Sequence, residues 1–190
     1  MAGNLAGGTH HATRAGGEGF CVFNDLAIVA LRLLQTGRCE RVAILDLDVH
    51  QGNGNSEILS GVPGVFVASV HGERNYPFTK VVSSIDVGLP DRTNDAQYLR
   101  VVQELLPHVL RFRPDIVLYQ AGVDGLESDR LGRLSLTHAG LIRRDELVLG
   151  ELRSRNIPVS LALGGGYAEP IVDTVNAHVG TYRVVRSTYG

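Results

Sequence analysis

Short apolar segments alternate along this chain with longer segments in which apolar residues recur at helical spacing. The short segments predict strands over residues 42–47, 65–70, 115–120 and 158–163, with weaker candidates at 81–87 and in the first few residues. The longer segments predict helices over 24–36, 94–112 (bent or ended near Pro107) and 137–155, and a fourth that begins near Pro170. Alternating strands and helices are typical of a parallel sheet. Because no repeat or linker interrupts the pattern, we expect an α/β fold and one domain over 1–190.

Polar side chains follow the predicted strands at the points where the strands end. Asp46, Asp48 and His50 alternate at the end of 42–47, so their side chains share one face of the chain. Three other strand ends also carry residues capable of chemistry: the pair His10-His11, Asp124 and Tyr167. Ligands of open parallel sheets bind beyond the carboxyl ends of the strands. We therefore expect these residues to form one site.

A metal ion would compensate for placing three polar groups at the end of an apolar strand. Asp48 and His50 supply two ligands at a spacing that suits zinc or a similar divalent ion, with Asp46 behind them. Asp124 is the natural third ligand. Two carboxylates and one neutral imidazole balance the charge of such an ion. A hydrogen-bonded cluster without metal is the alternative interpretation.

The adjacent histidines His10 and His11 are candidates for proton transfer. A histidine can take a proton from water and return it to a leaving amine when a partner orients its other ring nitrogen. Asp46 and Asn53 flank the metal ligands and are the candidate partners. Tyr167 follows three glycines, and its hydroxyl can donate to an oxyanion. A half-buried packing residue is the alternative interpretation of this tyrosine.

Several motifs, in order along the whole chain, resemble the zinc-dependent histone deacetylase family. They are Gly7-Gly8-Thr9-His10-His11, Gly19-Phe20-Cys21, the stretch from Asp46 to Gly54, Gly122-Val-Asp124 and Gly164-Gly-Gly-Tyr167. The stretch from Glu127 to Ser135 and the motif Arg144-Asp-Glu-Leu147 are most similar to the class IV branch and bacterial members. The resemblance implies a three-layer α/β/α sheet, the arginase/deacetylase fold. It also implies hydrolysis of an N-acyl amide, typically on a lysine side chain.

The resemblance implies a role for each matching residue. The family's zinc ligands match Asp48, His50 and Asp124. His11 matches the main general base and acid, with Asn53 as its partner. His10, paired with Asp46, matches an electrostatic role, and Tyr167 matches the tyrosine that stabilises the transition state.

The resemblance also implies how the substrate and a second ion are held. Residues of the substrate tunnel match Gly19, Phe20, Leu131 and Gly165. Family members bind potassium near the site, and the matching residues are Asp46, Asp48, His50 and Ser69. The implied substrates are an acyl-lysine protein or peptide, or a small acyl-amine such as an acetylpolyamine.

Composition limits the partners and the compartment. Apolar residues make up 44% of the chain, charged residues 20%, and the net charge is -2, so bulk electrostatics do not favour nucleic-acid binding. No apolar stretch reaches the length of a membrane span. Cys21 and Cys39 form no disulfide framework, which favours a reducing cytoplasm. We expect Arg143 and Arg144 to be solvated.

One departure from the family concerns the start of the fold. The family's domain is much longer before the two histidines, so we expect the first strands to be missing and the strand before His10 to lie at an edge. An uncovered edge favours self-association. An inert fragment or binding module that retains the metal site is therefore an alternative function. A ureohydrolase with two manganese ions would need an aspartate two residues after His50, where Gly52 stands.

Overall fold

The sheet has six parallel strands in a computed structural model that describes every residue from Met1 to Gly190. The strands are β1 (Ala2–Asn4), β2 (Val42–Asp46), β3 (Val65–Gly72), β4 (Ile85–Leu89), β5 (Ile116–Gln120) and β6 (Val159–Ala162). Their order across the sheet is β1-β6-β5-β2-β3-β4. The helices are α1 (Asp25–Gln35), α2 (Asn53–Leu59), α3 (Asp95–Arg111), α4 (His138–Ser154) and α5 (Ile171–Tyr189).

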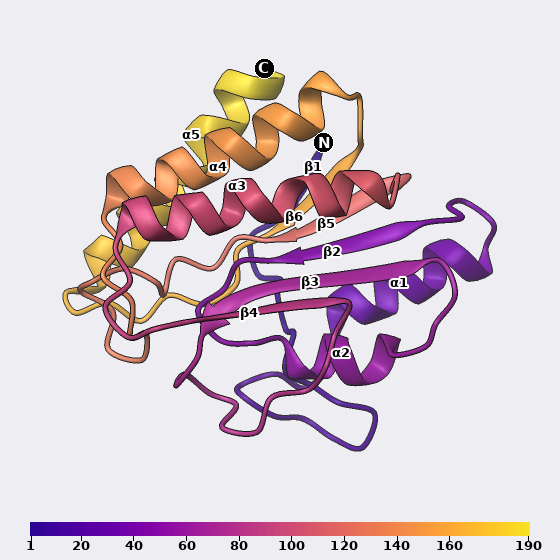
Figure 1. The fold of residues 1–190 in the computed structure, drawn as a ribbon, viewed down its shortest axis with the longest axis horizontal. Coiled ribbons are helices and arrows are strands. Elements are labelled where there is room, and N and C mark those ends of the chain that lie inside the picture. The colour runs from indigo at the N-terminus through magenta and orange to yellow at the C-terminus, as the bar shows by residue number, and fades with distance from the viewer.

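Helices cover both faces of the sheet and make three layers (Figure 1). Helices α3, α4 and α5 pack on one face over the larger apolar core, and α1 and α2 pack on the other over a smaller core. Every residue of β2 is buried, as expected for a central strand covered on both faces. The α/β fold expected from the sequence is therefore confirmed.

Local signals explain where the helices begin. Asn24 accepts a hydrogen bond from the backbone of Ala27 at 2.9 Å and starts α1. Asn94 and Gln97 form a reciprocal capping box at α3. Thr137 caps α4 through the backbone N–H of Gly140 at 3.0 Å, as predicted.

Three local details differ from the sequence-based expectation or go beyond it. The strand expected at 81–87 lies at Ile85–Leu89, because the backbone of Val81 bonds with the side chain of Gln51 instead of with a strand. Helix α3 continues through Pro107 rather than ending there, since buried residues on either side keep the helix packed. Helix α2 was not predicted, because its first residues Asn53, Gly54 and Asn55 have low helix propensity.

The first strand lies at an edge of the sheet, as expected. β1 pairs only with β6, and all of its residues are exposed. Self-association through this edge stays a prediction. None of the helices combines the length and the apolar character needed to span a bilayer.

Candidate active site

The carboxyl ends of the strands, at the left of Figure 1, bring the predicted site residues together. Asp48 and His50 follow β2, Asp124 follows β5, and Tyr167 follows β6. The segment between β1 and α1 carries the two adjacent histidines into the same place. Because parallel strands end at one side of the sheet, residues far apart in sequence form one cluster.

The three predicted metal ligands point at one another. His50 Nδ1 lies 2.9 Å from Asp124 Oδ2 and 3.2 Å from Asp48 Oδ1. One ligand atom from each residue lies within 4.8 Å of the others, and all three residues are buried. Backbone N–H groups hold the outer carboxylate oxygens: Gly165 donates to Asp48 at 2.7 Å and Val49 to Asp124 at 3.0 Å.

The charges of this trio fit a bound cation. Burial and the neighbouring carboxylate of Asp48 raise the pKa of Asp124 to about 7. Burial opposes charging of His50, but Asp124 and Asp48 outweigh it and raise the pKa of the imidazole to about 10. A proton on His50 therefore offsets the charge of one of the two buried carboxylates. A divalent ion would replace that proton, and one nitrogen with carboxylate oxygens is a donor set that zinc accepts.

The adjacent histidines have different partners, both as predicted. His10 Nδ1 lies 2.7 Å from Asp46 Oδ2, and His11 Nδ1 lies 2.7 Å from Asn53 Oδ1. Asn53 donates through Nδ2 to Glu18 at 2.6 Å, which fixes its amide oxygen toward His11. His11 therefore donates from Nδ1, and the lone pair of its Nε2 remains available.

The two histidines also differ in charge. Burial lowers the pKa of His10, but Asp46 and Asp48 outweigh it and raise that pKa to about 9. Burial and the charge of His10 lower the pKa of His11 to about 4. At neutral pH the site thus contains one cationic imidazole and one neutral imidazole beside it. A neutral imidazole can accept a proton.

Tyr167 stands above the trio as a neutral hydrogen-bond donor. Its ring centroid lies 6.4 Å from that of His50 and 6.1 Å from that of Phe20. Burial and the carboxylates of Asp48 and Asp124 raise the pKa of its phenol above the usual value. The phenol therefore keeps its proton at any working pH.

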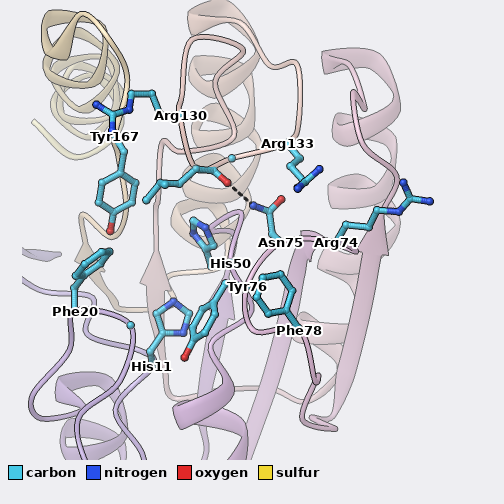
Figure 2. A pocket seen from close by; sticks show the side chains of 13 residues that line it. His11, Phe20, His50, Arg74, Asn75, Tyr76, Phe78, Arg130, Arg133 and Tyr167 are labelled. Carbon is cyan, nitrogen blue, oxygen red and sulfur yellow. Dashed lines mark hydrogen bonds between the residues drawn. The ribbon is translucent and has the colours of Figure 1, made fainter.

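The site opens into a pocket of about 560 Å³ (Figure 2). Gly19, Phe20 and Leu131, predicted as substrate-binding, line this pocket together with His11, His50 and Tyr167. Gly165 instead lines a smaller cavity of about 170 Å³ that shares His11, His50 and Tyr167 with the larger pocket. A side chain at Gly165 would overlap the carboxylate of Asp124, so this position requires glycine. Its contact with substrate stays a prediction.

The residues predicted to bind potassium are adjacent in the structure. Asp46 and Ser69 are paired in register on β2 and β3. The hydroxyl of Ser69 bonds with Nδ1 of His71 at 2.9 Å. Asp48 and His50 follow on the same segment, and potassium binding stays a prediction.

Sequence reasoning missed residues that support the site. Glu18 orients Asn53, and Asp129 accepts hydrogen bonds from the backbone of Leu131, Gly132 and Tyr167 at 2.6–2.8 Å. Both residues lie within or next to quoted motifs, but only their contacts indicate what they do. The pocket-lining residues Arg74, Asn75, Tyr76 and Phe78 belong to no predicted element or motif.

The prediction that Arg144 is solvated was wrong. Its side chain is 0% exposed, whereas that of Arg143 is 62% exposed. Arg144 Nε donates to Asp145 at 2.9 Å, and Nη1 donates to the carbonyl oxygen of Gly122 at 2.6 Å. Asp145 also accepts from Tyr119 and Thr181, so both buried charges are paired and hydrogen-bonded.

Sequence comparisons agree with this geometry. The family model "Histone deacetylase domain" matches residues 1–182. An uncharacterized protein of Picosynechococcus sp. is 45% identical over 190 residues, which are 100% of this chain and 63% of that protein. Histone deacetylase 2 of Arabidopsis thaliana is 37% identical over 180 residues, 90% of this chain and 46% of that protein.

Solved structures give the same result. The HDA15 HD domain superposes with a TM-score of 0.80 and 29% identity, over 96% of this chain and 55% of that one. Acetylpolyamine aminohydrolase from Burkholderia pseudomallei superposes with a TM-score of 0.78 and 26% identity, over 92% and 54%. The chain thus spans about half the length of these structures. With its parallel sheet and its buried Asp/His/Asp cluster, this chain belongs to the histone deacetylase domain family.

Proposed function

We propose that this chain is a zinc-dependent hydrolase that removes acyl groups from N-acyl amines, with acyl-lysine as the main substrate. One observation carries the proposal. The pocket is lined by a neutral His11, the Tyr167 phenol and His50, and His50 contacts Asp48 and Asp124 in the buried trio. Hydrolysis of an amide needs an electrophile, a base and an oxyanion donor, and this arrangement supplies a group for each.

Zinc held by Asp48, His50 and Asp124 would supply a Lewis acid that polarises the acyl carbonyl and acidifies water. The Tyr167 hydroxyl donates to the acyl oxygen as negative charge develops there. His11 Nε2 accepts a proton from the attacking water, while Asn53 holds the other ring nitrogen. The same proton then passes from His11 to the nitrogen of the leaving amine. The immediate products are the carboxylic acid and the free amine, and transfer of the acid's proton gives the carboxylate and the ammonium form.

His10 has an electrostatic role in this scheme. Its pKa of about 9 keeps it cationic at neutral pH, and Asp46 balances that charge. The positive charge makes it harder for His11 to hold a second proton, since His10 contributes to the low pKa of its neighbour. Protonated His11 is therefore a strong acid that readily donates its proton to the amine. The two histidines have different roles because Asp46 is the partner of His10 and Asn53 is the partner of His11.

The test is turnover of one peptide that carries a single lysine with acyl chains of increasing length. Zinc-loaded protein should release free lysine peptide from at least one member of the series, as measured by mass spectrometry. An acetylated polyamine is assayed in parallel as the small-amide alternative. If zinc-loaded, folded protein hydrolyses none of these amides, the proposal fails and the inert-fragment alternative stands.

A further inference from the structure

The outer part of the active-site pocket is basic. Arg74, Arg130 and Arg133 line it, and no aspartate or glutamate does. Figure 2 shows the three arginine side chains spread along one side of the opening, away from His11 and Phe20 on the other side. If the acyl-amide group of a substrate lies at the bottom of the pocket, the rest of the substrate stays outside. That outer part then lies next to the three guanidinium groups.

Most of the donor capacity of these arginines is free. Arg133 and Arg74 lie 3.3 Å and 3.8 Å from the same carboxylate, Asp91, and Arg130 lies 3.3 Å from Glu169. Side-chain exposures are 75% for Arg74, 65% for Arg130 and 55% for Arg133. Ion pairs this exposed are weak and exchange readily. Because two arginines share Asp91, the five side chains carry an excess positive charge.

Two aromatic residues lead along the same opening from His11 to the surface, where Phe78 is 86% exposed. Tyr76 stacks edge-on against His11, with ring centroids 5.0 Å apart, and Phe78 lies against Tyr76 at 6.3 Å. Asn75 donates to the carbonyl oxygen of Leu131 at 2.7 Å, which ties the loop carrying Arg74 to the loop carrying the other arginines. Arg74, Arg130 and Arg133, which we call the rim, therefore belong to one connected surface around the aromatic side chains of Tyr76 and Phe78. An aliphatic chain can pass the aromatic side chains, and charged groups of a substrate can contact the three arginines.

We propose that this rim selects acyl-lysine peptides whose neighbouring residues are acidic. The inference rests on the proposed deacylase function and names its substrate class. Guanidinium groups bind carboxylates through two parallel hydrogen bonds, and complementary charge also speeds encounter. An acylated polyamine brings further ammonium groups to the same rim and is repelled by it. The rim therefore favours acidic peptides over polyamines as the physiological class.

The experiment compares three peptides that share one acyl-lysine and differ only in flanking residues, which are aspartate, serine or lysine. The acidic peptide should exceed the basic one by about tenfold in kcat/KM at low ionic strength, and the ratio should shrink as salt rises. Fluorescence anisotropy of the labelled peptides should give the same order of binding. Because anisotropy needs no turnover, it tests the rim even if the proposed hydrolysis fails.

Two double variants locate the effect. Arg74→Gln with Arg130→Gln removes two rim charges and keeps the pair of Arg133 with Asp91, so the acidic-to-basic ratio should fall toward one. Arg100→Gln with Arg111→Gln removes the same charge from the exposed surface of α3 and should keep the ratio. Equal binding of the acidic and basic peptides, or equal loss in both variants, would overturn the inference. Hydrolysis of all three peptides at equal rates would overturn it while leaving the deacylase function intact.

Discussion

Arg144 donates to the carbonyl oxygen of Gly122 at 2.6 Å, two residues before the predicted metal ligand Asp124. Its guanidinium is buried beneath the site and also bonds with Asp145 and with the carbonyl oxygen of Ala121. Through Arg144, helix α4 thus holds the segment that follows β5 in place. A buried charge serves here to fix the backbone that carries a metal ligand.

Replacing Arg144 with methionine should destabilise the protein by about 3–5 kcal/mol, because Asp145 would remain as an uncompensated buried charge. Urea denaturation measures this loss. Arg143→Met, which removes an exposed charge from the neighbouring position, is the matched control and should change stability little. Equal stability of the two variants would mean that the buried network contributes nothing.

Asp124→Ala should lower zinc affinity by more than about 100-fold. Substitution of a residue that only supports a ligand already lowers metal affinity about 10- to 100-fold. Competition with a chromophoric chelator measures the affinity. The control is Asp173→Ala, which removes a carboxylate from the first turn of α5 outside the trio. Unchanged zinc affinity in Asp124→Ala would refute its role as a ligand.

Tyr167→Phe should reduce kcat by about 100- to 1000-fold while zinc content stays the same, because only the oxyanion donor is lost. Steady-state kinetics and metal analysis on the same sample separate the two effects. The control is Tyr182→Phe, which removes a phenol hydroxyl on α5 that has no hydrogen-bond partner. Near-normal kcat in Tyr167→Phe would rule out the proposed oxyanion role.

His178 should make the protein less stable in mild acid. Burial and the charge of Arg144 lower its pKa from 6.5 to about 4. Above pH 6.5 the histidine is neutral in both states, and between pH 6.5 and 4 only the unfolded chain takes up the proton. Its contribution to the free energy of unfolding is therefore lost as pH falls through this window.

The measurement for His178 is urea denaturation at pH 7.5 and pH 5 with a chelator present. Wild-type protein should lose more stability between the two conditions than His178→Gln. His108→Gln, on the exposed side of α3, is the control and should follow the wild type. Parallel losses in wild type and His178→Gln would contradict the assignment.

The sequence predicts those parts of the site that depend on the chain's direction through the sheet. Asp48, His50 and Asp124 follow apolar strands, and all parallel strands end at one side, so their meeting could be expected. Only the structure shows that their ligand atoms lie within 4.8 Å of one another. The partners of His10 and His11 were also expected, because Asp46 and Asn53 flank the ligands.

Other parts depend on contacts between distant segments. Arg144 lies in a polar stretch of helix, and only the carbonyl of Gly122 and the carboxylate of Asp145 explain its burial. The rim arginines belong to loops whose meeting is fixed by the bond between Asn75 and Leu131. Periodicity carries no information on such pairs, since it reports which face is buried but not what lies opposite.

The most direct test of the account is a zinc titration of the metal-free chain, followed by deacylation of an acyl-lysine peptide. We predict that activity rises linearly with added zinc and reaches its plateau at one zinc per chain, as expected for a single Asp/His/Asp site. Activity that needs no metal, or that reaches its plateau only at two metal ions per chain, would contradict it.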